Sequence, residues 1–308
     1  MVLSTVGRAD RLEGFVDAVL ADPGTGELVV VVDGDDPASV ATLGRLAATR
    51  PRLTAFAVPH CGQLAALDQG VLRATGEVVV LLDDDVVPAP GTIGGHLAHH
   101  RGHRRLVVAG PMPVEVRPGT VASVGTRLYA AEYRSHVAAI EQGHLDVLDA
   151  LWTGNLSLRR DDCLAVGLRS AAFRAHYHAD RDLGLRLAAA GLAGRFDPSL
   201  HAAHLHSRSD DAFLRDARRQ GAGRAMLHEV HPQLGRFTPR SLVADLPLPL
   251  QVACGVAGST RAARPLASGL MAFGRLARRA GRSRAELAAA KVARRVMQWR
   301  GAVAGEGP

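Results

Sequence analysis

The sequence predicts an α/β fold, a mainly parallel sheet flanked by helices, with a basic helical appendage at the C-terminus. Three observations support this prediction. Short apolar runs alternate with stretches of helical spacing over about the first 110 residues. Two of those runs end in clusters of Asp. From about residue 239 onward, the chain is rich in Ala and Arg at helical spacing.

The order of these stretches predicts the topology of the sheet. Strands are expected over residues 2–4, 28–32, 53–58 and 78–82. Helices are expected over residues 11–21, 39–48 and 64–74, the second with Ser39 as its N-cap. Strands that alternate with helices in this way form a parallel sheet with right-handed crossovers.

Length and composition narrow the class of protein. The chain has 308 residues, 47% hydrophobic and 22% charged, which is globular and large enough to bury a sizeable core. We expect neither a membrane span nor a signal peptide, because no apolar run is long enough and residues 1–10 lack a basic region before an apolar core. Cys61, Cys163 and Cys254 are far apart and odd in number, which predicts a reducing, cytoplasmic setting, with Cys163 and Cys254 as buried small hydrophobes.

The two acidic clusters predict a ligand site. They are Asp33, Asp35 and Asp36 after the second strand, and Asp83, Asp84 and Asp85 after the last. Ligands of parallel sheets bind outside the carboxyl ends of the strands. Gathered carboxylates repel one another, which a divalent cation such as Mg²⁺ or Mn²⁺ would relieve. Turn chemistry explains the first cluster equally well. Three Asp in succession after a buried strand favour function.

The stretch from residue 28 to 90 resembles the family 2 glycosyltransferases of the GT-A (Rossmann-like) fold. The family pattern is matched by VVVDGDDP (30–37), GQLAALDQG (62–70) and ATGEVVVLLDDDVVPAPG (74–91). Later segments agree in order: WTGNLSLRRDD (152–162), HADRDLGLRLAAAGL (178–192) and FDPSLHAAHLH (196–206). The resemblance implies a GT-A catalytic domain over residues 1–235, followed by a basic helical region over residues 236–308.

The resemblance also implies a reaction. A metal-dependent, inverting enzyme would move one sugar from a UDP-, GDP- or dTDP-sugar to a hydroxyl acceptor on a cell-envelope, lipid-linked or natural-product glycan. By position, Thr5, Arg8, Asp33, Asp83 and Asp84 would bind the nucleotide sugar, Asp85 and His204 the metal, and Trp152, Gly154 and Asn155 the acceptor, with Asp180 as general base. His206 is the competing choice for the metal-binding His.

The sequence departs from the family pattern in three places. Ala179 replaces the usual Glu before the general base, and Leu67 and Asp68 replace the usual Arg and Asn. The Gln-x-x-Arg-Trp of processive synthases is missing, which favours transfer of a single sugar. Without the resemblance, Asp180 would be read as an acidic residue favoured by the dipole of a helix N-terminus. A lone Trp152 is as consistent with a core position.

Histidines are numerous and raise the alternative of a zinc site. His96, His99, His100 and His103 have helical spacing, but surface polar residues are the favoured interpretation. His204 and His206 have strand spacing and would lie on the same face.

Charge is concentrated in the C-terminal region. The chain has 37 basic and 30 acidic residues, of which 11 and 2 fall in residues 255–308, giving +9 there and −2 elsewhere. With Leu276, Leu287, Val292, Val296 and Trp299, these basic residues suggest an amphipathic helix that contacts an anionic membrane peripherally at its cytoplasmic side. The alternative is an appendage packed on the catalytic domain with a solvated basic face. No nucleic-acid partner is expected, because no binding motif is present.

Two rival functions remain. The residues from Asp83 to Val87 also fit the nucleophile motif of haloacid-dehalogenase-type phosphatases, but Lys291 is the only Lys and no later acidic pair is evident. A non-catalytic domain that binds a nucleotide sugar or a membrane is the second rival, and Ala179 is its best support.

Overall fold

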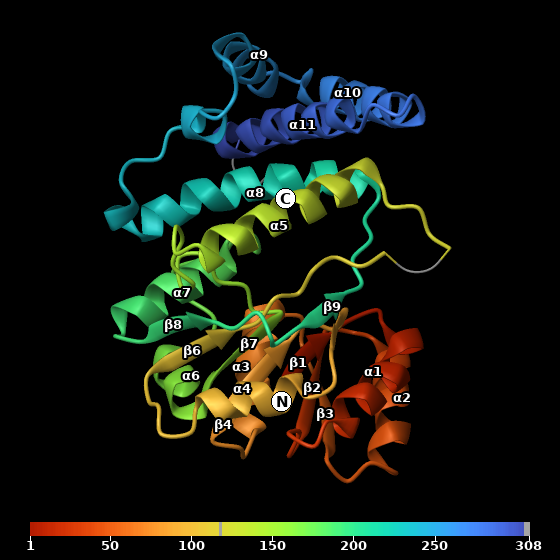
Figure 1. Ribbon diagram of the computed structural model, residues 1–308, viewed down its shortest axis with the longest axis vertical. Coiled ribbons are helices and arrows are strands. Elements are labelled where there is room, and N and C mark those ends of the chain that lie inside the picture. The colour runs from red at the N-terminus through yellow and green to blue at the C-terminus, as the bar shows by residue number, and fades with distance from the viewer. Residues whose placement is uncertain (117–118, 305–308) are drawn as a thin grey trace. The chain divides into compact units, whose positions relative to one another are not determined.

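A computed structural model describes residues 1–116 and 119–304 (Figure 1). The chain forms two compact units. The first comprises Met1–Glu115, Ser135–Ser170 and Asp180–Leu205, and the second Val116–Arg134, Ala171–Ala179 and His206–Pro308. The boundary expected at residue 235 falls inside the second unit, between the short helices η1 (Pro232–Leu234) and η2 (Pro239–Leu242).

The first unit is built on a seven-stranded sheet in the order β3-β2-β1-β4-β7-β6-β8. Its strands are β1 (Val2–Thr5), β2 (Leu28–Asp33), β3 (Leu53–Val58), β4 (Val78–Leu82), β6 (Leu106–Ala109), β7 (Asn155–Arg159) and β8 (Ala193–Phe196). All neighbours are parallel except that β7 runs antiparallel to both β4 and β6. The prediction of a mainly parallel sheet is therefore confirmed.

Three crossover helices follow the first three strands: α1 (Ala9–Ala21), α2 (Pro37–Ala47) and α3 (Gln63–Arg73). Because β4 lies on the opposite side of β1 from β2, right-handed crossovers place α1 and α2 on one face and α3 on the other. The N-cap assigned to Ser39 was wrong. Asp36 caps α2 by accepting a hydrogen bond from the Ser39 amide at 3.1 Å, because Pro37 takes the first helical position.

A second, two-stranded antiparallel sheet begins directly after the acidic cluster that follows β4. It pairs β5 (Val86–Pro88) with β9 (Ala202–His204), and Val86 lies opposite His204. The remaining helices of this part are α4 (Thr92–His99), α6 (Arg160–Val166) and α7 (Ala179–Ala189). The pairing of β5 with β9 brings the residues after β4 beside a segment that comes much later in the sequence.

The second unit is helical, as predicted for the C-terminal region. It contains part of α5 (Val124–Glu141), then α8 (Asp210–Val230), α9 (Leu248–Gly258), α10 (Ala263–Arg279) and α11 (Ser283–Ala304). Glycines allow α8 and α11 to approach closely. A Cβ on Gly221 would overlap the carbonyl oxygen of Gln298, and one on Gly301 would overlap that of Arg218.

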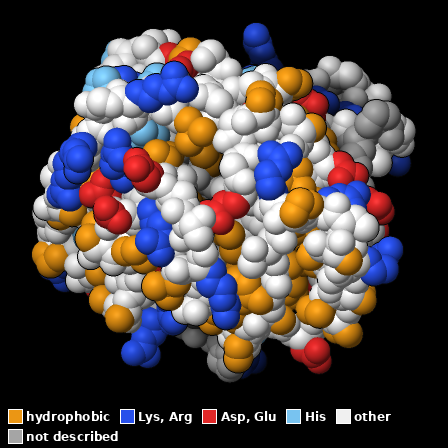
Figure 2. All heavy atoms as spheres, turned by 90° about the horizontal axis from the view of Figure 1, so that it is seen from below, with side chains coloured by type: hydrophobic (Ala, Val, Ile, Leu, Met, Phe, Trp, Pro, Cys, Tyr) orange, Lys and Arg blue, Asp and Glu red, His pale blue; other side chains and the backbone are white. Residues whose placement is uncertain are grey.

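Burial and surface charge agree with the globular composition. Cys163 and Cys254 are buried and free, as expected. On the face shown in Figure 2, basic and acidic side chains are intermixed. Within the described part of the chain, no helix combines the length and the apolar character that crossing a bilayer requires.

Candidate functional site

Asp84 and Asp85 lie beside the end of β1. The Thr5 hydroxyl donates a hydrogen bond to Asp84 Oδ2 at 2.7 Å. The Arg8 guanidinium lies 3.6 Å from Asp84 and 3.5 Å from Asp85. The sequence predicted that Thr5 and Arg8 bind the donor, and the structure brings them to the acidic cluster. Whether they contact a nucleotide stays a prediction.

Asp83 faces the interior of the same cluster. Gln63 Nε2 donates to Asp83 Oδ1 at 2.6 Å, and a Cβ on Gly154 would lie 2.7 Å from Asp83 Oδ2. Burial, followed by the charges of neighbouring carboxylates, raises the pKa of Asp83 to about 8. Burial also raises the pKa of Asp84, against the opposing hydrogen bond from Thr5. Full ionisation of the cluster is therefore unfavourable by itself, and a bound cation would stabilise the ionised carboxylates.

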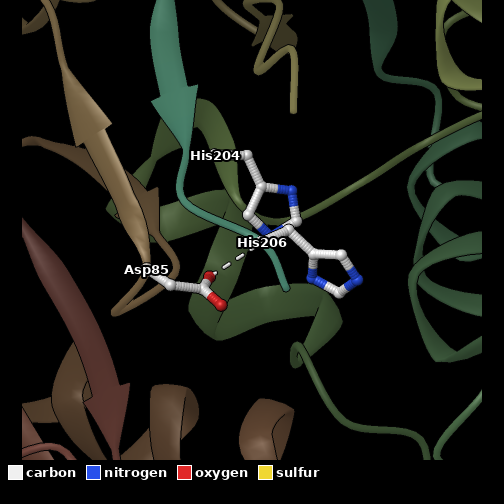
Figure 3. Close-up of side chains that lie close together, drawn as sticks. All are labelled: Asp85, His204 and His206. Carbon is white, nitrogen blue, oxygen red and sulfur yellow. Dashed lines mark ion pairs between the residues drawn. The ribbon is translucent and has the colours of Figure 1, made fainter. Parts of the chain in front are cut away.

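Asp85 and His204 form the candidate metal site. His204 Nε2 lies 3.3 Å from Asp85 Oδ1 (Figure 3), because the register of β5 and β9 places the two residues side by side. The amide of Leu205 also donates to the backbone carbonyl of Asp85 at 2.8 Å. His206 follows after a single residue, and one ligand atom from each of Asp85, His204 and His206 lies within 4.8 Å of the others.

The geometry of the Asp85–His204 pair suits a divalent ion. Neighbouring ligands of an octahedral ion with bonds of about 2.1 Å lie about 3 Å apart. The separation of 3.3 Å is close to this value. A carboxylate oxygen and an imidazole nitrogen are both accepted by first-row divalent ions such as Mn²⁺. The donor set therefore fits the predicted metal.

Asp180 lies in the first turn of α7 and its charge reaches Asp83. The Thr153 hydroxyl donates to Asp180 Oδ1 at 3.0 Å. Burial raises the pKa of Asp180 to about 6, although hydrogen bonds from Thr153 act in the opposite direction. Asp182, in the same turn, is buried and paired with Arg186 Nε at 2.9 Å. Only Asp180 of the two thus has the environment of a proton acceptor.

Asp33 ends β2 and is almost fully buried. Its two carboxylate oxygens accept hydrogen bonds from the amides of Cys61 at 2.7 Å and Gly62 at 3.1 Å. His60 Nδ1 lies 3.2 Å from the same carboxylate. Asp33 therefore fixes the loop between β3 and α3. A contact with a nucleobase stays a prediction.

The three residues predicted to bind the acceptor differ in whether they lie at the acidic cluster or in the protein core. Trp152 is buried and donates from Nε1 to the Gly110 carbonyl at 3.1 Å, with its ring against Phe196. Asn155 is fully buried. Its amide donates to the carbonyls of Pro111 at 3.2 Å and Leu200 at 2.7 Å. Of the three, Gly154 borders the acidic cluster, while the side chains of Trp152 and Asn155 bind protein groups.

Two of the clustered histidines are core residues, so the expectation that all four are surface residues was wrong. His96 and His100 are buried in α4 and its C-cap. His96 Nε2 lies 3.0 Å from Asn155 Oδ1, and Ser157 Oγ lies 2.9 Å from His96 Nδ1 and 2.8 Å from His100 Nε2. Burial lowers the pKa of both imidazoles to about 4.

The hydrogen bonds of this cluster have one consistent direction when both imidazoles are neutral. Asn155 Oδ1 can only accept, so His96 donates from Nε2 and accepts at Nδ1 from the Ser157 hydroxyl. Ser157 in turn accepts from His100 Nε2. Hydrogen bonds to Asn155 and Ser157 therefore account for both ring nitrogens of His96 and for Nε2 of His100, while the buried Nδ1 of His100 has no hydrogen-bond partner among the described residues.

Three functional or supporting residues were missed or undervalued from the sequence. Gln63 and Thr153 contact Asp83 and Asp180, and their place beside the Gly-x-x-x and Gly-Asn segments was the available signal. Asp68 was noted only as a departure from the family pattern. Its carboxylate accepts from the amides of Leu168 at 2.7 Å and Arg169 at 2.9 Å, so it anchors the loop after α6.

Comparison with known proteins places this site in a family. A family model described as glycosyl transferase family 2 matches residues 1–148, which include β1, β2, β4 and the acidic cluster. The match covers 148 of the 308 residues and confirms, for this part of the chain, the resemblance to a glycosyltransferase family seen in the sequence. No curated protein sequence matches the chain.

Solved structures support the fold. A mannosyltransferase from Pyrobaculum calidifontis, in complex with GDP-Man and Mn²⁺, matches with a TM-score of 0.56 at 19% identity, covering 94% of this chain and 85% of that one. GalNAc-T7 with UDP, GalNAc and Mn²⁺ matches with a TM-score of 0.50 at 11% identity, covering 76% of this chain and 51% of that one. At these identities the likeness concerns the fold, and the predicted GT-A fold is confirmed.

Proposed function

We propose that this chain is a family 2 glycosyltransferase that moves one sugar from a nucleotide-diphosphate sugar to a hydroxyl acceptor, with inversion and with a divalent metal. The observation that carries the proposal is that the charges of Asp180 and of Asp85, which lies beside His204, both act on Asp83 in one acidic cluster. Such a cluster offers a metal position and a proton acceptor within one site.

The donor would lie along the carboxyl ends of β1, β2 and β4. This edge carries Thr5, Arg8, Asp84 and Asp33. A divalent ion held by Asp85 and His204 would neutralise the negative charge of the leaving diphosphate. Mn²⁺ with GDP-Man in one structural relative, and with UDP in another, supports a metal and a nucleotide sugar here. UDP-, GDP- and dTDP-sugars are the donors to test.

Asp180 would act as the general base. A pKa of about 6 leaves its carboxylate ionised at neutral pH and basic enough to take a proton from the acceptor hydroxyl. A base positioned in this way accelerates the transfer about 10²–10⁴-fold. Direct attack by that hydroxyl from the face opposite the leaving diphosphate inverts the anomeric centre. The acceptor would be a cell-envelope, lipid-linked or natural-product glycan that presents this hydroxyl.

The first experiment is a donor panel measured by calorimetry, with Mn²⁺ and with EDTA. One class of donor should bind in the presence of Mn²⁺ and fail to bind in EDTA. Asp85→Ala should lose the metal-dependent binding, because it removes the carboxylate of the metal pair. Asp180→Asn should keep donor binding and lose sugar transfer. Asp161→Asn, which changes an exposed carboxylate in α6, is the matched control and should behave as the wild type.

The outcomes separate the candidate functions. Metal-dependent donor binding that survives in Asp85→Ala would refute the assigned metal pair. If the wild type binds a donor but transfers no sugar, and Asp180→Asn binds the donor equally well, a non-catalytic nucleotide-sugar-binding domain would be favoured. A retained anomeric configuration in the product, measured by NMR, would exclude direct displacement by the acceptor.

A further inference from the structure

Helix α10 carries two apolar stripes, and only one of them is used in packing. The inner stripe consists of Ala263, Ala267 and Met271, which are buried in a core cluster shared with α11, and of Ala277, which is also buried. The outer stripe consists of Ala262, Leu266, Gly269, Phe273, Leu276 and Ala280, spaced alternately by four and three residues, and all are exposed. Three large apolar side chains of α10, Leu266, Phe273 and Leu276, are therefore exposed, whereas Leu270 and Met271 pack inward.

The exposure of this outer stripe is substantial. Leu266 is 43% exposed, Phe273 54% and Leu276 61%. Helix α9 adds a similar row at intervals of four residues, where Leu248 is 71% exposed, Val252 58% and Val256 65%. Two rows of exposed large apolar side chains are uncommon on one soluble domain, and exposed apolar patches mark interaction sites. Packing within the second unit leaves both rows uncovered.

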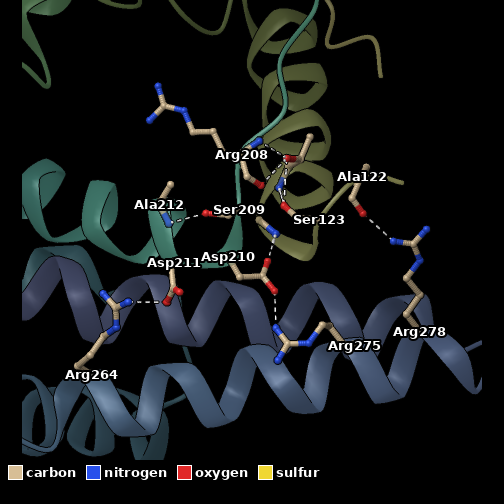
Figure 4. A network of polar contacts seen from close by, with 12 residues as sticks. Ala122, Ser123, Arg208, Ser209, Asp210, Asp211, Ala212, Arg264, Arg275 and Arg278 are labelled. Atoms are coloured by element: carbon tan, nitrogen blue, oxygen red, sulfur yellow. Dashed lines mark hydrogen bonds and ion pairs between the residues drawn. The ribbon is translucent and has the colours of Figure 1, made fainter. Parts of the chain in front are cut away.

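Ten of the eleven basic residues in residues 255–308 divide into two groups, and the eleventh is Arg300. Six bind protein groups. Figure 4 shows Arg264 paired with Asp211, Arg275 paired with Asp210, and Arg278 donating to the Ala122 carbonyl. In addition, Lys291 and Arg295 pair with Asp245, and Arg294 pairs with Glu132. On α11 the apolar side chains also turn inward, with Val296 and Met297 buried. The basic amphipathic face that the sequence suggested on this helix is therefore used internally.

Four exposed arginines make no ion pair with a described residue: Arg261, Arg279, Arg282 and Arg284. Arg261 precedes the outer stripe of α10, and the other three surround its C-terminal end. The stripe thus has unpaired positive charge at both ends. A second copy of this chain would bring like charges together there, which disfavours self-association through the stripe. An anionic surface with an apolar interior complements both features.

We propose that the outer stripe of α10, together with the exposed row of α9, binds the surface of an anionic lipid bilayer. Phe273, Leu266 and Leu276 enter the boundary between headgroups and acyl chains, and the four arginines contact lipid phosphates. The protein would be held peripherally, at the cytoplasmic face if the setting expected from its cysteines is correct. An acceptor carried on a lipid would then be presented at the same surface.

The test is flotation of the full-length protein with vesicles of phosphatidylcholine alone or with about one-third phosphatidylglycerol. Wild-type protein should float with the anionic vesicles, and the bound fraction should fall as salt is raised. The double variant Phe273→Ser/Leu276→Ser should weaken binding at least about 10-fold, since each removes a large apolar side chain from the boundary. Leu72→Ser, at an exposed leucine of α3, is the matched control and should bind as the wild type.

The charge contribution is tested separately. Arg279→Gln/Arg282→Gln/Arg284→Gln should reduce binding and its salt dependence, whereas Arg45→Gln/Arg101→Gln/Arg104→Gln removes the same charge elsewhere and should change binding less. Circular dichroism and donor calorimetry on the same samples show that each variant is folded and keeps its donor site.

Two results would overturn the proposal. One is wild-type protein that fails to float with anionic vesicles or floats equally with neutral ones. The other is a wild-type dimer, measured by light scattering, that Phe273→Ser/Leu276→Ser converts to a monomer without changing flotation. The second result would assign the stripe to a second copy of this chain. Neither result depends on donor binding, so the proposed glycosyltransferase activity is tested separately by the donor panel.

Discussion

Replacing Asp180 by Asn should stabilise the protein while abolishing sugar transfer. The pKa of Asp180 is about 6 in the folded chain, and an Asp in an unfolded chain has a pKa near 4. Folding therefore favours the protonated carboxyl. The stability that this preference contributes is fully present below pH 4 and is lost as the pH rises through 6.

The size of the effect follows from the same two values. Each pKa unit corresponds to about 1.4 kcal/mol, so an ionised Asp180 lowers the free energy of unfolding by about 2–3 kcal/mol at pH 7.5. Asn carries no charge and can still accept the hydrogen bond from Thr153. Asp180→Asn should therefore raise the free energy of unfolding by about that amount at pH 7.5 and by well under 1 kcal/mol at pH 4.

The assay is urea unfolding of both proteins in EDTA at several pH values, because a bound cation would itself stabilise the ionised carboxylate. Asp182→Asn is the control in the same turn of α7. It leaves Arg186 without its carboxylate partner and should destabilise the fold by about 3 kcal/mol. The assigned environment of Asp180 would be refuted if Asp180→Asn were no more stable than the wild type at pH 7.5. It would also be refuted if the variant were stabilised equally at pH 4 and pH 7.5.

Three further predictions concern the scaffold. His96 and His100 have pKa values of about 4 in the folded chain, so the stability they contribute is present above pH 6.5 and falls as the pH drops toward 4. Between pH 7 and 4.5, unfolding of His100→Gln should therefore depend less on pH than that of the wild type. Gly221→Ala should destabilise the α8–α11 contact by about 1–3 kcal/mol, whereas Gly44→Ala, where a Cβ meets nothing, should stabilise by about 0.5–1 kcal/mol; thermal unfolding compares them. Gly154→Ala should lower sugar transfer with little change in circular dichroism, because its Cβ would lie 2.7 Å from Asp83 Oδ2 and Met112 Sδ.

The first half of the sheet could be predicted because its signals are local. Each of the first four strands is a short, mainly apolar run, and each expected boundary lies within one residue of the observed strand. The antiparallel strand β7 and the pairing of β5 with β9 could not be predicted in this way. Their partners are far away in the sequence, and β5 has only three residues.

The site residues also divide into those that the local sequence identified and those whose role depends on distant partners. Asp83, Asp84 and Asp85 stood out because three carboxylates in succession are costly without a cation. Asn155 and Trp152 matched a family segment, but sequence position cannot show whether a side chain faces a ligand or the core. His96 and His100 were misjudged for a related reason: histidine is intermediate in its tendency to be buried, and only the structure shows that Asn155 and Ser157 of β7 offer these imidazoles hydrogen bonds in the core.

Asn155 connects the two halves of the acidic site, which gives it a role other than binding the acceptor. Its backbone directly follows Gly154, which faces Asp83, and its side-chain amide holds the Leu200 carbonyl just before β9. The end of β9 carries His204, the partner of Asp85. His96 fixes the orientation of that amide by donating to Oδ1. The spacing between the Asp83 side and the metal side of the cluster therefore depends on a buried, neutral hydrogen-bond chain that itself contains no metal ligand.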